Sequence, residues 1–371
     1  MSMLRIPRAR RLLSACQKRH QLSAEPLSTP LPSTPPSSNR PLSTSCPINY
    51  RTSPSLLASS PPIHEPSALY VVGGLYGNLQ ALQFIENLTS SHSSPPTVIY
   101  NGDFHFFDKR PKTFDSVQRS IVDSESVLAT AGNVEKEIAS LDSTSCGCDY
   151  PEYTDFKVTE RSDAIVGRLK KNAEPHAENL LNLPLFRRVE MPNTKVGVIH
   201  GDCNSLSGWD YAVENVEPVD VKLRADLNMR GDYPVTSVSR IVEDMEAADV
   251  DILCCTHTCL PYMQDLGGGK VIVNNGSAGM GNFEGDKTGL ITRIVSGDEV
   301  GGGGEVVYEI EVGGDRGCRV QSVKVDFDFD AFWEEFSNEW EEGSPARESY
   351  EGRIWRGVGF WSADRARRMI E

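Results

Sequence analysis

The chain has 371 residues, of which 39% are hydrophobic and 24% charged, and its formal net charge is −15. This composition is typical of a water-soluble globular protein with a sizeable core. The acidic balance disfavours non-specific binding to nucleic acid or anionic lipid, and no apolar run approaches the roughly 20 residues of a membrane span. The nine cysteines are odd in number and several lie in apolar runs, which indicates reduced thiols.

Residues 1–66 are predicted to be a disordered leader outside the fold. They contain eight basic and two acidic residues, and the first 20 residues contain no acid. The Ser- and Pro-rich sequence that follows cannot bury enough apolar surface to offset the entropy of ordering. An Arg-rich start without a long apolar run is typical of a transit peptide, and the Arg clustering favours the mitochondrion. The alternatives are a plastid address and an unstructured tail on a cytoplasmic protein.

Strand and helix patterns alternate through residues 67–295, which are predicted to form one α/β domain. A strand at 68–74, a helix at 79–88 and a strand at 98–101 make the first βαβ unit. Further helices are predicted at 113–123, from 134, at 163–182, from 233 and at 332–340. Further strands are predicted at 126–131, 187–191, 195–200, 251–255, 270–274, 290–295, 306–312 and 320–327. Residues 296–371, after a Gly-rich linker, are expected to complete the domain.

Four polar side chains stand where predicted buried strands end. Asp103 follows an apolar run through Asn-Gly, and Asn133, His200 and His257 follow three others. A single Asp after a strand is usually a turn residue or a helix cap. One carboxylate, one amide oxygen and two imidazoles at four strand ends are instead a typical set of metal ligands.

The motifs at these strand ends resemble those of the calcineurin-like metallophosphoesterases. The order GGLYGN, NGD, AGNVE, IHGD, THTCLP and NNGS is similar to DxHGN, GD, GNHD, HG, GHTHxP and NPGS of the small bacterial-type branch. The likeness covers about residues 69–281. It implies a two-sheet α/β sandwich flanked by helices, here with a β-rich C-terminal extension. It also implies two divalent metals that supply a hydroxide to attack a phosphate ester.

The resemblance leaves one metal site intact. The ligands of the family's second metal fall on Asp103, Asn133, His200 and His257, and two nitrogens with two oxygens suit Mn, Fe or Zn. Asp103, His200 and His257 are therefore also the candidate catalytic residues. The resemblance thus implies no more than one complete metal site, and it implies that the protein binds a phosphate ester.

The resemblance also shows that the family's first metal site is broken. Gly74 and Tyr76 replace the Asp and His of DxH, and Cys259 replaces the second His of GHTH. Val134 stands where the family has its catalytic His, although Glu135 after it is retained. The loss of these metal ligands puts two-metal catalysis in doubt. Separately, loss of a general acid typically removes 10²–10⁴ in rate.

Several residues are candidates for rebuilding the missing site. Cys259 could ligate zinc as a thiolate, Tyr76 could ligate ferric iron, and His105 follows Asp103 closely. Cys146 and Cys148 flank a glycine in a polar loop. Each residue has a structural alternative: a small buried cysteine, a packed tyrosine, a half-buried histidine and a tight Cys-Gly-Cys turn.

Three functional hypotheses follow. The first is an atypical metal-dependent phosphoesterase that uses one intact metal site. The second is a catalytically inactive relative that binds a phosphate-bearing ligand or a protein partner. The third is thiol-based redox or metal sensing through Cys146, Cys148 and Cys259.

Overall fold

The structure is a computed structural model, and it describes residues 50–64, 66–297, 302–313 and 317–368. All of these residues belong to one unit that spans residues 44–371. No helix in the described part of the chain is long and apolar enough to cross a membrane. Residues 1–49, and with them most of the predicted leader, lie outside the described residues.

One sheet has six strands. They are β2 (Ala68–Val72), β3 (Thr97–Asn101), β4 (Leu128–Thr130), β10 (Gly289–Ser296), β11 (Val306–Val312) and β12 (Cys318–Val325). Their order is β11-β12-β10-β2-β3-β4. Strands β2, β3 and β4 pair in parallel, whereas β10 is antiparallel to both β2 and β12. The C-terminal strands β11 and β12 thus extend the sheet that contains β3.

The other sheet has seven strands. They are β1 (Ile63–His64), β5 (Phe186–Met191), β6 (Thr194–Ile199), β7 (Ile252–Cys255), β8 (Tyr262–Gly267), β9 (Lys270–Asn274) and β13 (Arg367–Arg368). Their order is β1-β5-β6-β7-β9-β8-β13. Strands β6, β7 and β9 are parallel and form the centre of this sheet.

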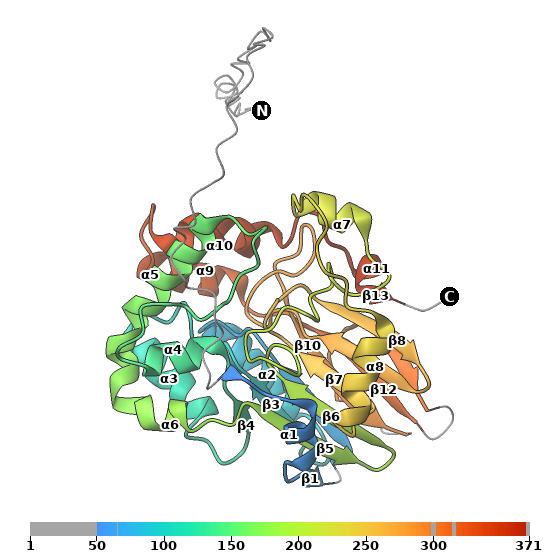
Figure 1. The fold of residues 1–371 in the computed structure, drawn as a ribbon. Helices are drawn as coiled ribbons and strands as arrows, with labels where there is room; N and C mark the ends of the chain where they lie inside the picture. Colours follow the sequence, from blue (N-terminus) through green and yellow to red (C-terminus); the bar gives the residue numbers. More distant parts are fainter. Residues whose placement is uncertain (1–49, 65, 298–301, 314–316, 369–371) are drawn as a thin grey trace, which may run out of the picture. The chain divides into compact units, whose positions relative to one another are not determined.

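Helices flank the two sheets. They are α1 (Pro54–Ser59), α2 (Leu79–Ser90), α3 (Pro111–Ile121), α4 (Asn133–Ala139), α5 (Phe156–Ala173), a 3₁₀ turn (Glu174–His176), α6 (Ala177–Leu181), α7 (Val221–Asp226), α8 (Val238–Ala247), α9 (Phe329–Glu339), α10 (Pro345–Arg356) and α11 (Ala363–Ala366). Figure 1 shows α3–α6 gathered on one side and α8 beside β7. The predicted two-sheet α/β fold flanked by helices is confirmed.

The alternation of side chains along β2 explains how the layers pack. Leu69 and Val71 belong to a core cluster with Val196 and Val198 of β6, so they fill the space between the sheets. Tyr70 and Val72, on the opposite face of β2, belong to a second cluster with side chains of α3 and α5. Strands buried on both faces read as continuous apolar runs, which is why β2 was predictable.

Two sequence-based predictions of elements were wrong, and one element was missed. Residues 50–64 lie in the fold: α1 is there, β1 pairs with β5, and Tyr50 is buried, so the predicted leader extends too far. The helix predicted from Tyr233 begins only at Val238, where the Ser237 side chain caps it. Helix α10 was not predicted, because its apolar positions are few and charged residues dominate it.

Candidate metal centre

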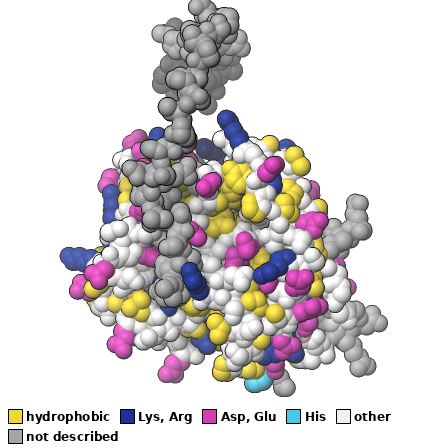
Figure 2. Space-filling model, viewed as in Figure 1, with side chains coloured by type: hydrophobic (Ala, Val, Ile, Leu, Met, Phe, Trp, Pro, Cys, Tyr) yellow, Lys and Arg dark blue, Asp and Glu magenta, His cyan; other side chains and the backbone are white. Residues whose placement is uncertain are grey.

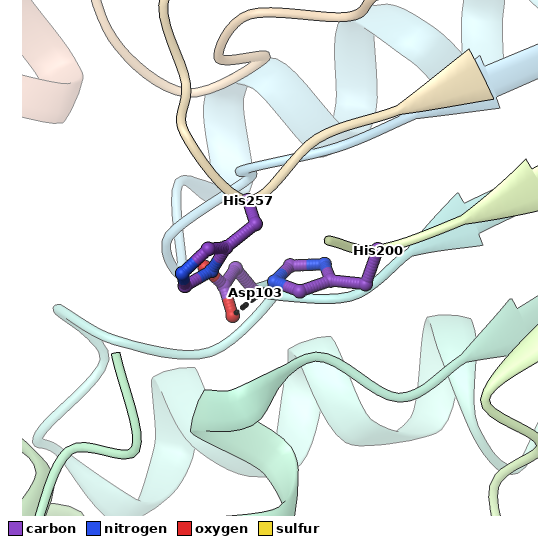
Figure 3. Close-up of side chains that lie close together, drawn as sticks. All are labelled: Asp103, His200 and His257. Atoms are coloured by element: carbon purple, nitrogen blue, oxygen red, sulfur yellow. Dashed lines mark ion pairs between the residues drawn. The ribbon is translucent and has the colours of Figure 1, made fainter. Parts of the chain in front are cut away.

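Strands of both sheets end at the candidate metal centre. Asp103 lies two residues after β3, and Asn133 is the first residue of α4, after β4. His200 directly follows β6, and His257 lies two residues after β7. One ligand atom from each of Asp103, His200 and His257 lies within 4.8 Å of the others. Figure 3 shows these three side chains turned toward one another.

A hydrogen bond fixes the orientation of the His200 ring. Its Nδ1 donates to the carbonyl oxygen of Asn101 at 2.8 Å, so Nε2 points to the other side of the ring, toward Asn133 and Asp103. This Nε2 lies 3.2 Å from Asn133 Oδ1 and 3.4 Å from Asp103 Oδ1. An imidazole that donates one N–H to a backbone carbonyl has the orientation of a metal ligand.

Asn133 and His257 are oriented by the loop that contains Cys146 and Cys148. Asn133 Nδ2 donates to the carbonyl of Cys146 at 2.9 Å, which turns Oδ1 toward His200. His257 Nε2 donates to the carbonyl of Cys148 at 2.9 Å. His257 Nδ1 then carries the lone pair, and it is buried without a hydrogen-bond partner.

These contacts bring side-chain nitrogen and oxygen atoms from four strand ends to one point. His200 Nε2 faces both Asn133 Oδ1 and Asp103 Oδ1, and Asp103 Oδ1 also accepts from the N–H of Val134 at 3.4 Å. The buried Nδ1 of His257, which has no hydrogen-bond partner, is the fourth atom of this kind. The residues present therefore fit a divalent metal with nitrogen and oxygen ligands.

Burial and mutual charge set the protonation of the cluster. Burial alone would raise the pKa of Asp103, but the imidazoles of His200 and His257 bring it below its ordinary value. Burial alone would lower the pKa of His200, but the Asp103 carboxylate raises it. Burial, followed by the charge of His200, lowers the pKa of His257 to about 4. Ionised Asp103 and neutral His257 are the forms that bind metals.

The backbone at the centre adopts conformations that most residues avoid. Tyr76, Asp103 and Cys259 have φ of 57°, 53° and 52°. A Cβ on Gly102, which has a φ of 74°, would lie 2.5 Å from both Gly132 Cα and His200 Nδ1. Non-glycine residues with a left-handed backbone conformation are uncommon, and they gather at functional sites.

Glu135 holds the loop of Asp103 in place. Its buried carboxylate accepts from the backbone N–H groups of Asp103 at 2.8 Å, Phe104 at 3.0 Å and His105 at 3.2 Å. It also accepts from the N–H of Gly132 at 2.9 Å. This one side chain thus joins the turn after β3 to the start of α4, where Asn133 lies.

Packed side chains fill the space around positions 74, 76 and 259, which were considered above as the place of a second metal. The hydroxyl of Tyr76 lies 2.6 Å from Cys259 Sγ, and both residues are buried. A Cβ at Gly74 would lie 2.9 Å from the Tyr76 ring, so this ring takes the space of an acidic side chain at 74. Burial first, and then Asp103, raises the pKa of Cys259 to about 11 although Arg353 opposes this. Tyr76 and Cys259 are thus beside the centre in their neutral forms.

The structure does not bring His105 to the centre. Its Nδ1 lies 2.6 Å from Asp108 Oδ2, and its ring stacks on Phe114 at 3.9 Å between centroids. Its Nε2 lies 3.4 Å from Gln118 Oε1. The prediction of His105 as a replacement ligand was therefore wrong, because both ring nitrogens are engaged elsewhere in the core.

Cys146 and Cys148 contribute mainly through their backbone carbonyls. The Cys146 carbonyl accepts from Asn133, and the Cys148 carbonyl accepts from His257 and, at 3.0 Å, from Trp209 Nε1. Cys148 Sγ also accepts from Asn133 Nδ2 at 3.4 Å. Both cysteines of this loop, which was predicted to be polar, are buried. Backbone roles leave no signature in side-chain chemistry, so the sequence drew attention to these thiols and not to their carbonyls.

A cavity of about 40 Å³ opens beside Asp103 and His257. It is lined by Tyr76, Asp103, Phe106, Val134, Cys148, Tyr150, Trp209, His257 and Tyr350. A volume of this size holds a water molecule or two. The role of Tyr350 was missed because the sequence gave no indication of α10.

Comparisons with known proteins yield structural likenesses only. No protein-family model matches the chain, and no curated protein matches it. A hypothetical protein from Pyrococcus horikoshii is 14% identical, over 78% of this chain and 98% of that one, with a TM-score of 0.48. A metallophosphoesterase from Sphaerobacter thermophilus is 15% identical over 78% and 100%, with a TM-score of 0.43. A protein serine/threonine phosphatase from Saccharomyces cerevisiae is 15% identical over 73% and 86%, with a TM-score of 0.36.

All three TM-scores lie below 0.5, so only the residues of this chain bear on its function.

Proposed function

We propose that the protein is a metal-dependent phosphoesterase with one metal position. The observation that carries the proposal is the convergence of side-chain nitrogen and oxygen atoms from Asp103, Asn133, His200 and His257, among which His257 Nδ1 is buried without a hydrogen-bond partner. Bound there, a divalent ion would polarise a phosphoryl oxygen and generate a hydroxide nucleophile from water near neutral pH. Two nitrogen and two oxygen ligands suit Mn, Fe or Zn.

The chain's own residues favour one ion rather than two. Tyr76 and Cys259 contact each other at 2.6 Å where the resemblance implies a second set of ligands. Their burial keeps them protonated, because it raises the pKa of both groups. Asp103 therefore serves a single ion instead of bridging a pair.

The surroundings of the centre limit the ester that reaches it. The cavity of about 40 Å³ has room for water but not for a phosphate ester. Tyr150, Trp209 and Tyr350 line it from three different segments of the chain.

The test uses the full-length protein and an activated phosphodiester, because a good leaving group depends least on a general acid. The wild-type protein is expected to bind about one equivalent of Mn²⁺ or Zn²⁺ and to hydrolyse the ester slowly. His257→Ala is expected to abolish both metal binding and turnover, because no neighbouring side chain can replace the imidazole as a ligand of a single ion. His64→Ala, at an exposed histidine, is the matched control and should leave both unchanged.

A second candidate function is a non-catalytic protein that binds a phosphate-bearing ligand at the same centre. Val134, in the cavity wall, supplies no proton where the resemblance implies an acid, and this favours the second candidate. Tight metal binding without turnover above the His257→Ala background, on any of a set of mono- and diesters, would reject the phosphoesterase. Metal-dependent binding of inorganic phosphate in that same protein would support the alternative.

A further inference from the structure

The first described residues of the chain run alongside the loop that follows His200. The carbonyl of Tyr50 accepts from Leu206 N at 2.9 Å, and Thr52 N donates to the Asn204 carbonyl at 3.0 Å. The Thr52 hydroxyl adds a bond of 2.8 Å to the Cys203 carbonyl. Residues 50–52 are thus attached to the loop 203–206, at the end of β6 from which His200 extends.

The side chain of Tyr50 reaches from this segment to helix α4. Its ring is 1% exposed, and its hydroxyl donates to Glu137 Oε1 at 2.5 Å. The same hydroxyl lies 3.5 Å from the carbonyl of Asn133. Glu137 is one helical turn after Asn133, so Tyr50 holds the end of α4 that presents the Asn133 amide.

Tyr50 also packs against the loop of Cys146 and Cys148. A Cβ at Gly147 would lie 2.8 Å from the Tyr50 hydroxyl and 2.8 Å from Glu137, so the loop lies directly on this pair. The carbonyls on either side of Gly147 are those that accept from Asn133 and His257. The Tyr50 hydroxyl thus contacts the helix and the loop that orient two of the four candidate ligands, Asn133 and His257.

We propose that Tyr50 is a positioning residue of the metal centre, and that residues 50–52 are a clamp that joins α4, the loop 146–148 and the loop 203–206. The proposal rests on the metal-binding part of the proposed function and not on turnover. It also implies that any processing of the N-terminus ends before Tyr50, because removal of the clamp would release the loop that orients Asn133 and His257.

The test separates the hydroxyl from the packing of the ring. Tyr50→Phe in the full-length protein keeps the buried ring and removes only the hydroxyl, with its bonds to Glu137 and to the Asn133 carbonyl. Loss of such an outer contact is expected to weaken Co²⁺ binding roughly 10–100-fold. The visible absorption bands of bound Co²⁺ should shift as well, because the ligands are reoriented. Tyr308→Phe, at a buried tyrosine of β11 that does not line the cavity, is the matched control and should bind Co²⁺ as the wild type does.

The outcomes separate this proposal from the proposed function. Tyr50→Phe with wild-type affinity and wild-type Co²⁺ bands overturns the clamp and leaves the phosphoesterase untouched. Weaker binding explained by partial unfolding, seen as an unfolding midpoint near the assay temperature in the metal-free variant, also overturns it. Metal binding by the wild type without turnover overturns only the phosphoesterase, and no metal binding by the wild type overturns both.

The implied limit on processing has its own measurement. Mass spectrometry of the protein isolated from its own cells is expected to find an N-terminus upstream of Tyr50. A metal-containing protein whose chain begins after residue 52 would overturn the clamp.

Discussion

Asn101 joins the two sheets directly behind the metal centre. Its side-chain amide donates to the Ile199 carbonyl at 2.6 Å and to Thr256 Oγ1 at 2.8 Å, both in the opposite sheet or its end loops. Its own carbonyl accepts from His200 Nδ1. The residue after it in the motif, Gly102, has no room for a side chain. The Asn-Gly-Asp sequence thus contains, in succession, a residue that links the sheets, a glycine in close contact with its neighbours, and a candidate metal ligand.

Glu135 offers a sharp test at this scale. In the wild type, both carboxylate oxygens of Glu135 accept from backbone N–H groups. Glu135→Gln replaces one of these oxygens by an N–H₂ group, so at least one buried N–H donor loses its acceptor. We expect a loss of about 1–3 kcal/mol in the free energy of unfolding. Urea unfolding of the metal-free protein measures this loss, with Glu160→Gln, at an exposed acid of α5, as the control. Equal midpoints for the two variants would contradict the assigned role.

Sequence and structure agree best for residues whose chemistry and position coincide. Asp103, Asn133, His200 and His257 could be found because each polar residue ends an apolar run, and parallel strands bring such ends together. Their convergence in space agrees with the sequence-based prediction, while metal binding itself is a proposal. His105 was misassigned because its neighbourhood in sequence is that of a ligand, whereas its ring turns into the core toward Asp108.

At the scale of elements, the contacts missed by sequence analysis come from backbone groups and from weakly patterned segments. The carbonyls of the loop 146–148 orient two ligands, but a carbonyl is present in every residue and gives no sequence signal. Helix α10 brings Tyr350 to the cavity although its pattern is mostly charged. Tyr50 lies in a Ser/Pro-rich stretch, where composition predicts disorder even though tertiary contacts order its end.

The loop that follows β6 provides a spectroscopic prediction. Its Trp209 lies against His257, with 5.4 Å between ring centroids at 77°. Paramagnetic Co²⁺ at the centre should therefore quench the fluorescence of Trp209 more than that of the other four tryptophans. Titration to saturation should show most of the quenching lost in Trp209→Phe and kept in Trp355→Phe, at a partly exposed tryptophan of α10. Similar quenching in both variants would place the bound Co²⁺ elsewhere.

At the scale of the whole molecule, charge is divided unevenly along the chain. Residues 1–66 carry eight basic and two acidic residues, whereas the remainder carries 29 basic and 50 acidic residues. On the face drawn in Figure 2, acidic side chains are spread widely with Lys and Arg among them. A basic N-terminal segment on an acidic protein is the asymmetry that an organelle address produces.

We propose that this address lies within residues 1–49, because the clamp of the metal centre begins at Tyr50. A fluorescent protein fused to residues 1–49 is expected to enter the mitochondrion. Replacing Arg5, Arg8, Arg10 and Arg11 by Ser removes half of the eight basic residues that precede residue 67 and should leave the signal in the cytosol. Import into plastids would support a targeting role for residues 1–49 and would contradict only the choice of the mitochondrion. A cytosolic signal from the unaltered segment would contradict the proposal, since an Arg-rich, acid-free start would then have no targeting role.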